Sequence, residues 1–174
     1  PDAKPEARQP RLAAIRQATE RLKLLFTLTL DRERQEAVGV PPSALSVDLL
    51  LKDLEALCGR VLRGRLRIDL AAPEAQVRAD SRELGFALLN LLEGMAEVSP
   101  RDSALTLSVT GERNERGLPQ VVLILTAPRS LEGERFSGTT FVRSVFEAYG
   151  GGFRWLPAEE GMQRVQLWLP EALQ

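Results

Sequence analysis

The feature that most restricts the fold of this chain is a change in the spacing of its apolar residues near residues 39–42 (GVPP). Over residues 11–38, apolar side chains recur at intervals of three and four, as at Ile15, Leu22 and Leu25, which is the spacing of one long amphipathic helix. Beyond the prolines, stretches with helical spacing alternate with stretches in which every second residue is apolar, as in strands. A chain that uses both spacings in turn predicts an α+β fold, with helices on one face of a mixed sheet.

The same change of spacing divides the chain into three parts. Residues 1–10 are polar and rich in proline, which predicts a flexible tail. Residues 11–42 are expected to form the long helix and the turn that ends it, and residues 43–174 the globular domain. The apolar stripe of the long helix needs a cover. We favour pairing with another helix over packing against the rest of this chain.

Within the globular domain the spacing predicts an alternation of short strands and helices. The expected strands lie near residues 45–47, 66–70, 105–110, 120–126, 153–156 and 164–169. The expected helices lie near residues 48–62, 81–98 and 139–149, and Asp80 or Ser81 is expected to cap the second of them. Residues 111–117 are rich in turn formers and are expected to connect two strands.

The composition excludes several kinds of site. The chain has no histidine, which excludes Ser-His-Asp and Cys-His nucleophile pairs, the common zinc sites and a phosphohistidine formed within these residues. The single cysteine, Cys58, is expected to be a buried thiol in a reducing compartment. A formal charge of −1 gives no indication of a nucleic-acid partner. Without a long apolar run or a signal-peptide pattern, we expect a cytoplasmic chain, or the cytoplasmic part of a longer protein, with no membrane contact.

Four strings of this chain resemble segments of bacterial sensor histidine kinases, and they occur in the family's order. "AAIRQATERLKLLFTLTLDRERQEAV" is similar to the second helix of the dimerisation and phosphotransfer stem, and "LSVDLLLKDLEAL" to the segment leading into the catalytic, ATP-binding domain. "DSRELGFALLNLLEGMAEVSP" looks like the N-box helix, and "FSGTTFVRSVFEAYGGGFRW" like the second glycine box and the helix after it. The resemblance implies a Bergerat-type (GHKL) two-layer α/β sandwich preceded by a dimerisation helix. The stem's first helix, which carries the phosphoacceptor histidine in the family, has no match here.

The resemblance also implies a nucleotide site on the helix near residues 81–98, where the matching positions are altered. The family's N-box helix presents two asparagines one turn apart, and the second binds magnesium. Asn90 matches the first, but Gly94 stands at the second and has no side chain. Glu97 replaces a family lysine that favours phosphate, and Phe86 replaces a polar residue. Helical spacing places these positions on one face.

The two glycine boxes are altered as well. The family's first box reads Asp-x-Gly, in which the aspartate binds the adenine amine, whereas this chain has Ala127 and Arg129 at these positions. The second box normally reads Gly-x-Gly at a helix N-terminus, where backbone N–H groups hold phosphate. Gly138 is the one glycine kept there, and Thr139 and Thr140 follow it.

These substitutions predict that the nucleotide site has lost its function. Removing the adenine hydrogen bond and the metal ligand costs roughly 1–3 kcal/mol each, which together is about two to four orders of magnitude in affinity. Glu97 would also repel a polyphosphate. We therefore expect no cofactor and no metal site, with Glu93 and Glu97 on a solvated face. Trp155 and Trp168 are expected to pack on the sheet.

Three functions remain open at this point. We favour a two-component signalling module with a degenerate ATP site, which contacts a response regulator or a partner kinase and forms a homodimer through residues 11–38. The first alternative is an active histidine kinase domain that binds ATP and magnesium in an atypical pocket, with substitutes such as Glu93, Arg101 or Arg129. The second alternative is a phosphotransferase whose histidine lies outside this chain.

Overall fold

The computed structural model describes residues 43–62, 64–128, 139–159 and 161–172. The expected helix of residues 11–38 and its pairing lie outside the described residues, as do Arg129 and Gly138. All described residues belong to the unit that begins at Pro42. None of the described helices is both long and apolar enough to cross a membrane.

The described elements follow the expected order with one addition, the short strand β3. They are β1 (Ala44–Ser46), α2 (Val47–Val61), β2 (Leu66–Leu70), β3 (Gln76–Arg78), α3 (Ser81–Glu97), β4 (Leu105–Arg113), β5 (Pro119–Pro128), α4 (Thr139–Ala148), β6 (Gly152–Trp155) and β7 (Met162–Pro170).

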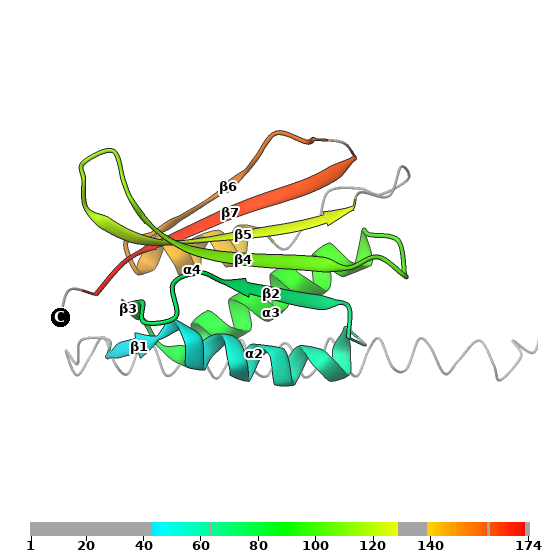
Figure 1. The fold of residues 1–174 in the computed structure, drawn as a ribbon, viewed down its shortest axis with the longest axis horizontal. Coiled ribbons are helices and arrows are strands. Elements are labelled where there is room, and N and C mark those ends of the chain that lie inside the picture. The colour runs from blue at the N-terminus through cyan, green and yellow to red at the C-terminus, as the bar shows by residue number, and fades with distance from the viewer. Residues whose placement is uncertain (1–42, 63, 129–138, 160, 173–174) are drawn as a thin grey trace, which may run out of the picture. The chain divides into compact units, whose positions relative to one another are not determined.

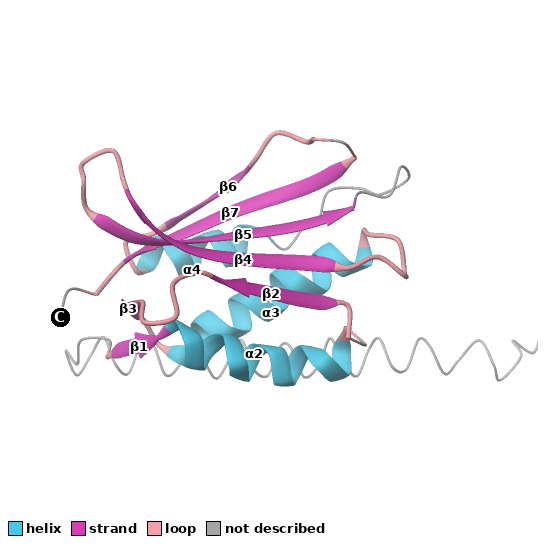
Figure 2. Cartoon of the chain, in the orientation of Figure 1, coloured by secondary structure: helices cyan, strands magenta, loops and turns pink. Residues whose placement is uncertain are grey.

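The main layer is a five-stranded sheet with the strand order β2-β4-β5-β7-β6. β2 and β4 run parallel, and the other neighbours run antiparallel. The helices α2, α3 and α4 lie on one face of this sheet (Figures 1 and 2). β1 and β3 form a separate antiparallel pair. The expected α+β fold, a mixed sheet with helices on one face, is confirmed.

The core lies between the sheet and the helices. In β4, Leu105, Leu107 and Val109 are buried, and the side chains between them are half-buried, because successive residues of a strand point to opposite faces. The helix α3 buries most of its length, since it packs against α2, α4, β4 and β5. Cys58 is buried, as expected, in the same core.

The most informative differences from the expected strands are at β3 and at the β4–β5 connection. β3 has a single buried residue, Val77, and this is too short a pattern to show alternation. Its identity as a strand comes from pairing with β1. Residues 111–113 belong to β4 rather than to the expected turn over 111–117, because Gly111 pairs with Val121 and Arg113 with Pro119. Cross-strand pairing here overrides the local preference of a glycine-rich sequence.

The helix α3 is held at both ends. Asp80 is its N-cap, and one carboxylate oxygen accepts hydrogen bonds from the backbone N–H groups of Arg82 and Glu83, at 2.9 and 3.1 Å. Beyond the other end, the guanidinium of Arg65 donates to three backbone carbonyl oxygens. These belong to Ala96, Pro100 and Ser103. Both ends therefore have partners for groups that a helix leaves unpaired.

Two glycines bring β6 and the turn before it unusually close to β7. Gly152 pairs with Trp168, and a Cβ at position 152 would lie 2.2 Å from the indole atom Cζ2 of that tryptophan. A Cβ at Gly151 would lie 1.9 Å from the carbonyl oxygen of Trp168. A side chain fits at position 151 only if the backbone of β7 moves, and at position 152 only if the indole of Trp168 moves.

Candidate nucleotide site

The N-box positions lie on the C-terminal half of α3, as the sequence predicted. Asn90 is half-buried, and its side chain forms no hydrogen bond with another described residue. Gly94 is buried and Glu97 is exposed. Along the helix, Asn90 thus provides one amide, Gly94 provides no side chain, and Glu97 provides a solvent-exposed carboxylate. This set lacks the second amide that the resemblance assigns to the metal.

An aromatic pair joins α3 to the start of α4. The rings of Phe86 and Phe141 meet edge to face, with centroids 5.7 Å apart and an interplanar angle of 68°. Phe86 is 8% exposed. The N-box face is therefore joined by an apolar contact to the first turn of α4, where the resemblance places phosphate-binding N–H groups.

Ala127 lies near the end of β5 and is fully buried, at 0% exposure. It belongs to the same core as Leu125, two residues earlier on the same side of the strand. A buried methyl group presents no acceptor to an adenine amine. The position that would read the base is thus part of the hydrophobic core.

The first turn of α4 is the part of the second glycine box that the structure describes. Thr139 is half-buried and Thr140 is exposed. The helix has ten residues and no acidic residue in its first turn, so its backbone N–H groups are a possible anion-binding feature. Gly138 and Arg129 lie outside the described residues.

The expectation for Glu93 was wrong. The sequence placed Glu93 and Glu97 together on a solvated face, but Glu93 is only 9% exposed whereas Glu97 is exposed. The reason is that α2, α4 and the sheet pack around α3, so that only a narrow strip of its surface is exposed to solvent. Glu93 also has interaction partners of its own, so it does not form an exposed carboxylate pair with Glu97.

The described residues contain no cluster of three or more acidic, cysteine or histidine side chains that would hold a metal ion. Burial raises the pKa of the Cys58 thiol to about 11, because desolvation disfavours the thiolate. This thiol is protonated at neutral pH and is neither a nucleophile nor a metal ligand. Arg101, a candidate substitute ligand, is exposed in the turn after α3.

Sequence reasoning missed a polar contact that joins α3 to the end of α4. The hydroxyl of Tyr149 donates a 2.5 Å hydrogen bond to the carboxylate of Glu83, which is buried. Burial and this hydrogen bond raise the pKa of Tyr149 above its ordinary value of 10.0. The two residues are far apart in sequence, and no local spacing signals their contact. The missed partner Phe141 is similar, since a single phenylalanine in a helix's first turn has no periodic signature.

Sequence comparisons found no relatives. No protein-family model matches the chain, and no curated protein matches it.

Solved structures do resemble it. The histidine kinase AdeS of Acinetobacter baumannii has a TM-score of 0.63 at 14% identity, over 97% of this chain and 86% of that one. The mycobacterial sensor histidine kinase MprB has a TM-score of 0.55 at 19% identity, over 74% of this chain and 98% of that one. The histidine kinase domain of the Escherichia coli osmosensor EnvZ has a TM-score of 0.59 at 13% identity, over 78% and 92%. The chain therefore has the fold of sensor histidine kinase catalytic domains, and the expectation drawn from the four strings is confirmed at the level of fold.

Proposed function

We propose that this chain, which has a histidine kinase catalytic fold, is a two-component signalling module that has lost ATP binding in the usual mode and acts through protein–protein contacts. The observation that carries the proposal is the burial of Ala127 at 0% exposure. The residue at the adenine-reading position is inside the core, so restoring the hydrogen bond would require a polar group where no water reaches.

Two further features support the loss of nucleotide binding. Gly94 provides no ligand for magnesium, and Phe86 packs against Phe141 where a polar face is expected. Each loss weakens binding, and together they leave roughly millimolar affinity or worse if the ancestral site bound at micromolar concentration.

Calorimetry with ATP and magnesium tests this proposal. The native chain should give no saturable heat at about 0.1 mM protein, and the variant carrying Gly94→Asn and Ala127→Asp should gain binding if the rest of the pocket persists. Circular dichroism must show that this variant is folded, because an aspartate at a buried position is costly. Micromolar binding by the native chain would overturn the proposal and favour an atypical active kinase pocket, with the N–H groups at Thr139 and Thr140 as phosphate ligands.

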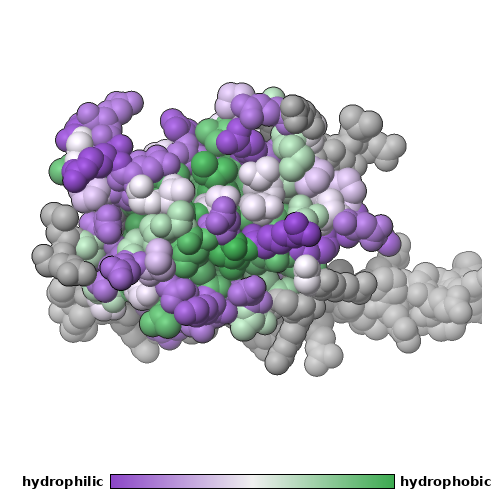
Figure 3. Space-filling view, viewed as in Figure 1, coloured by the Kyte–Doolittle hydropathy of each residue, from purple (hydrophilic) through white to green (hydrophobic). Residues whose placement is uncertain are grey.

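The proposed partner surface lies where the edge strand β2 meets α2. Leu66, Ile68 and Leu70 of β2 are half-buried and pack on the core, and Leu49 of α2 is 60% exposed. Figure 3 shows hydrophobic surface across the middle of this side of the molecule, surrounded by hydrophilic side chains. Exposed apolar surface is a feature of protein contacts, and a response regulator or partner kinase is the partner that the fold favours.

A binding screen tests this surface. Purified receiver domains and kinase stems from the source genome would be tested against the chain by interferometry. Leu49→Asp should weaken any binding by about tenfold or more, because it places a charge in an apolar interface. Leu118→Asp is the matched control, since Leu118 is similarly exposed at 56% but lies on the β4–β5 turn. Equal loss from both variants would contradict this assignment.

The proposal includes homodimerisation through residues 11–38, whose apolar stripe needs a cover. Light scattering should give twice the chain mass for the full chain and the monomer mass for a chain that begins at Pro42. A dimer formed equally by both would exclude this role for residues 11–38. If a histidine precedes this sequence in the full protein, the dimer becomes a candidate phosphotransferase as well.

A further inference from the structure

The face of the sheet that carries no helix has a hollow beside the β4–β5 hairpin. The hairpin rises from the sheet on the side away from the helices (Figure 1). The hollow has a volume of about 440 Å³, in the range of small-molecule sites. It is lined by Glu112, Arg113, Asn114, Glu115, Arg116, Leu118, Gln120, Arg154, Gln166 and Trp168. None of these positions belongs to the nucleotide motifs.

The indole of Trp168 is held in place by its neighbours on the adjacent strands. Trp168 pairs with Gly152, and its indole lies directly over that glycine, as the 2.2 Å distance to a hypothetical Cβ shows. Its other strand partner is Val122, which is fully buried. A cross-strand aromatic over a glycine is a stable arrangement, so Trp168 forms a rigid aromatic surface rather than a mobile side chain.

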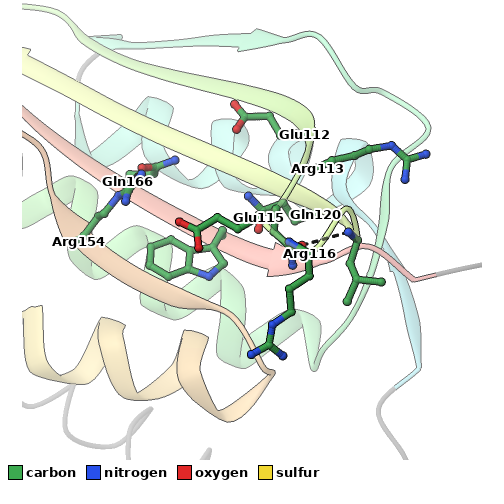
Figure 4. A pocket seen from close by; sticks show the side chains of 10 residues that line it. Glu112, Arg113, Glu115, Arg116, Gln120, Arg154 and Gln166 are labelled. Atoms are coloured by element: carbon green, nitrogen blue, oxygen red, sulfur yellow. Dashed lines mark hydrogen bonds between the residues drawn. The ribbon is translucent and has the colours of Figure 1, made fainter.

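Arg154 is held in position beside this indole. Its guanidinium lies 5.8 Å from the ring centroid of Trp168, and its Nε donates a 2.6 Å hydrogen bond to Oε1 of Gln166. Figure 4 shows Arg154 and Gln166 next to each other on one side of the hollow. The Nη groups of Arg154 have no partner among the described residues. A fixed guanidinium with free Nη groups is preorganised for a carboxylate.

Gln166 points to a ligand independently of Arg154. It is only 8% exposed although it lies on the open face. Its Oε1 accepts from Arg154, and its Nε2 donates to no other described residue. A buried donor without an acceptor is unfavourable. An acceptor entering the hollow beside Arg154 would satisfy it.

The charges around the hollow are mixed, because in the view of Figure 4 the Glu115 side chain extends towards Arg154 while Arg113 and Arg116 point away from it. Its lining contains three arginines and two glutamates. One of the glutamates, Glu112, already accepts a 3.0 Å hydrogen bond from the hydroxyl of Thr110. Arg113 donates at 2.7 Å to the carbonyl oxygen of Gly117 within the turn. At the rim, the exposed side chain of Leu118 adds apolar surface.

We propose that this hollow is a binding site for a carboxylate attached to a flat apolar group. The carboxylate accepts hydrogen bonds from the Nη groups of Arg154 and from Nε2 of Gln166, while the apolar group lies on Trp168. This chemistry is shared by a free aromatic acid and by a peptide that ends in an aromatic residue. The site is independent of the proposed signalling function and of the state of the nucleotide site.

Tryptophan fluorescence tests the proposal directly. The chain has two tryptophans, and Trp155 lies against Phe153, with ring centroids 6.1 Å apart. In Trp155→Phe the fluorescence therefore reports Trp168 alone. Titration with 3-phenylpropionate should change the emission in a saturable way. The neutral 3-phenylpropanamide should bind about tenfold or more weakly, because it loses the charge-assisted bonds.

Two substitutions in the same background test the assigned groups. Arg154→Gln and Gln166→Leu should each weaken 3-phenylpropionate binding, the first by about tenfold or more. Arg67→Gln is the matched control, because Arg67 is an exposed arginine on β2, at the opposite edge of the sheet. Thermal unfolding of each variant identifies any loss of fold, and the comparison of acid with amide in the Trp155→Phe chain needs no further substitution.

Two peptides distinguish a free aromatic acid from the end of a peptide as the ligand of the hollow. N-acetyl-Gly-Phe with a free carboxylate should bind more tightly than 3-phenylpropionate if the site takes a peptide end, and less tightly if it takes a free acid. Its amidated form should be inactive in either case. The proposal is overturned if no probe saturates the signal, if the acid and amide bind equally, or if Arg67→Gln weakens binding as much as Arg154→Gln.

Discussion

The two faces of the five-stranded sheet differ in whether their side chains pack as apolar groups or form polar contacts. On the helix-covered face, positions that resemble a nucleotide site carry apolar side chains that pack, as with Ala127 and the pair of Phe86 and Phe141. On the open face, polar side chains meet across strands, as Arg154 and Gln166 do. The face that resembles a binding site is the one on which these positions are packed. The face without a recognised motif keeps unpaired donors.

The contrast arises within single strands. In β7, Val165 and Leu167 point to the helices and are fully buried, while Gln166 between them points to the open face. Since neighbouring residues of a strand face opposite ways, the two faces can change independently. The proposed loss of nucleotide binding on one side therefore places no restriction on ligand chemistry on the other.

The largest effect should come from the helix-covered face. Phe86→Ala should lower the free energy of unfolding by about 3–5 kcal/mol, because it leaves a cavity and removes the ring contact with Phe141. Urea denaturation measures the change. Phe86→Leu, which keeps most of the volume, is the control and should lose much less. A cost for Phe86→Ala below about 1 kcal/mol would mean that the space is open and available to a ligand.

A smaller effect is expected where the helix-covered face is joined by a polar contact. Tyr149→Phe removes the hydrogen bond to the buried Glu83 and should cost about 1–2 kcal/mol at neutral pH. The same denaturation experiment measures it. An unchanged free energy of unfolding would show that Glu83 is satisfied by its other interactions alone.

The same tyrosine predicts a pH dependence. Its pKa in the folded state is raised above the ordinary 10.0. Below pH 10.0 the phenol of Tyr149 is protonated in both the folded and the unfolded state, and its contribution to the free energy of unfolding is complete. As the pH rises above 10.0 towards the higher folded pKa, the unfolded state loses its proton first and stability falls. Denaturation midpoints should drop less with pH in Tyr149→Phe than in the native chain. Equal slopes would refute the coupling.

The smallest effect is expected on the open face. Arg154→Gln should change the free energy of unfolding by less than about 1 kcal/mol, because the guanidinium is exposed and its contact with Trp168 is a solvent-accessible cation–π pair. A larger loss would show that Arg154 stabilises the sheet, and the comparison of the two faces would then rest on Gln166 alone.

The sequence predicted more of the fold than of the site. Strands such as β2 (Leu66–Leu70) were located at their observed bounds because alternation and flanking turns are local signals. β3 was missed since its three residues become a strand only through pairing with β1. The kept position Asn90 and the altered positions Gly94 and Ala127 were found through resemblance to a family. The burial of Glu93 and the contact of Tyr149 with Glu83 depend on how helices pack, which no local pattern encodes.

The glycines at 151 and 152 have a consequence for how such chains change under mutation. Both are required by contact with Trp168, which leaves no room for a Cβ. In a library of random substitutions selected only for soluble protein, these two codons should stay glycine, while the half-buried Asn90 should vary. The glycine-rich string that helps to identify this fold would then survive in descendants that have lost every nucleotide ligand. Such a string reflects a constraint on the backbone. A sequence search based on it will therefore find proteins that have lost the activity together with active enzymes.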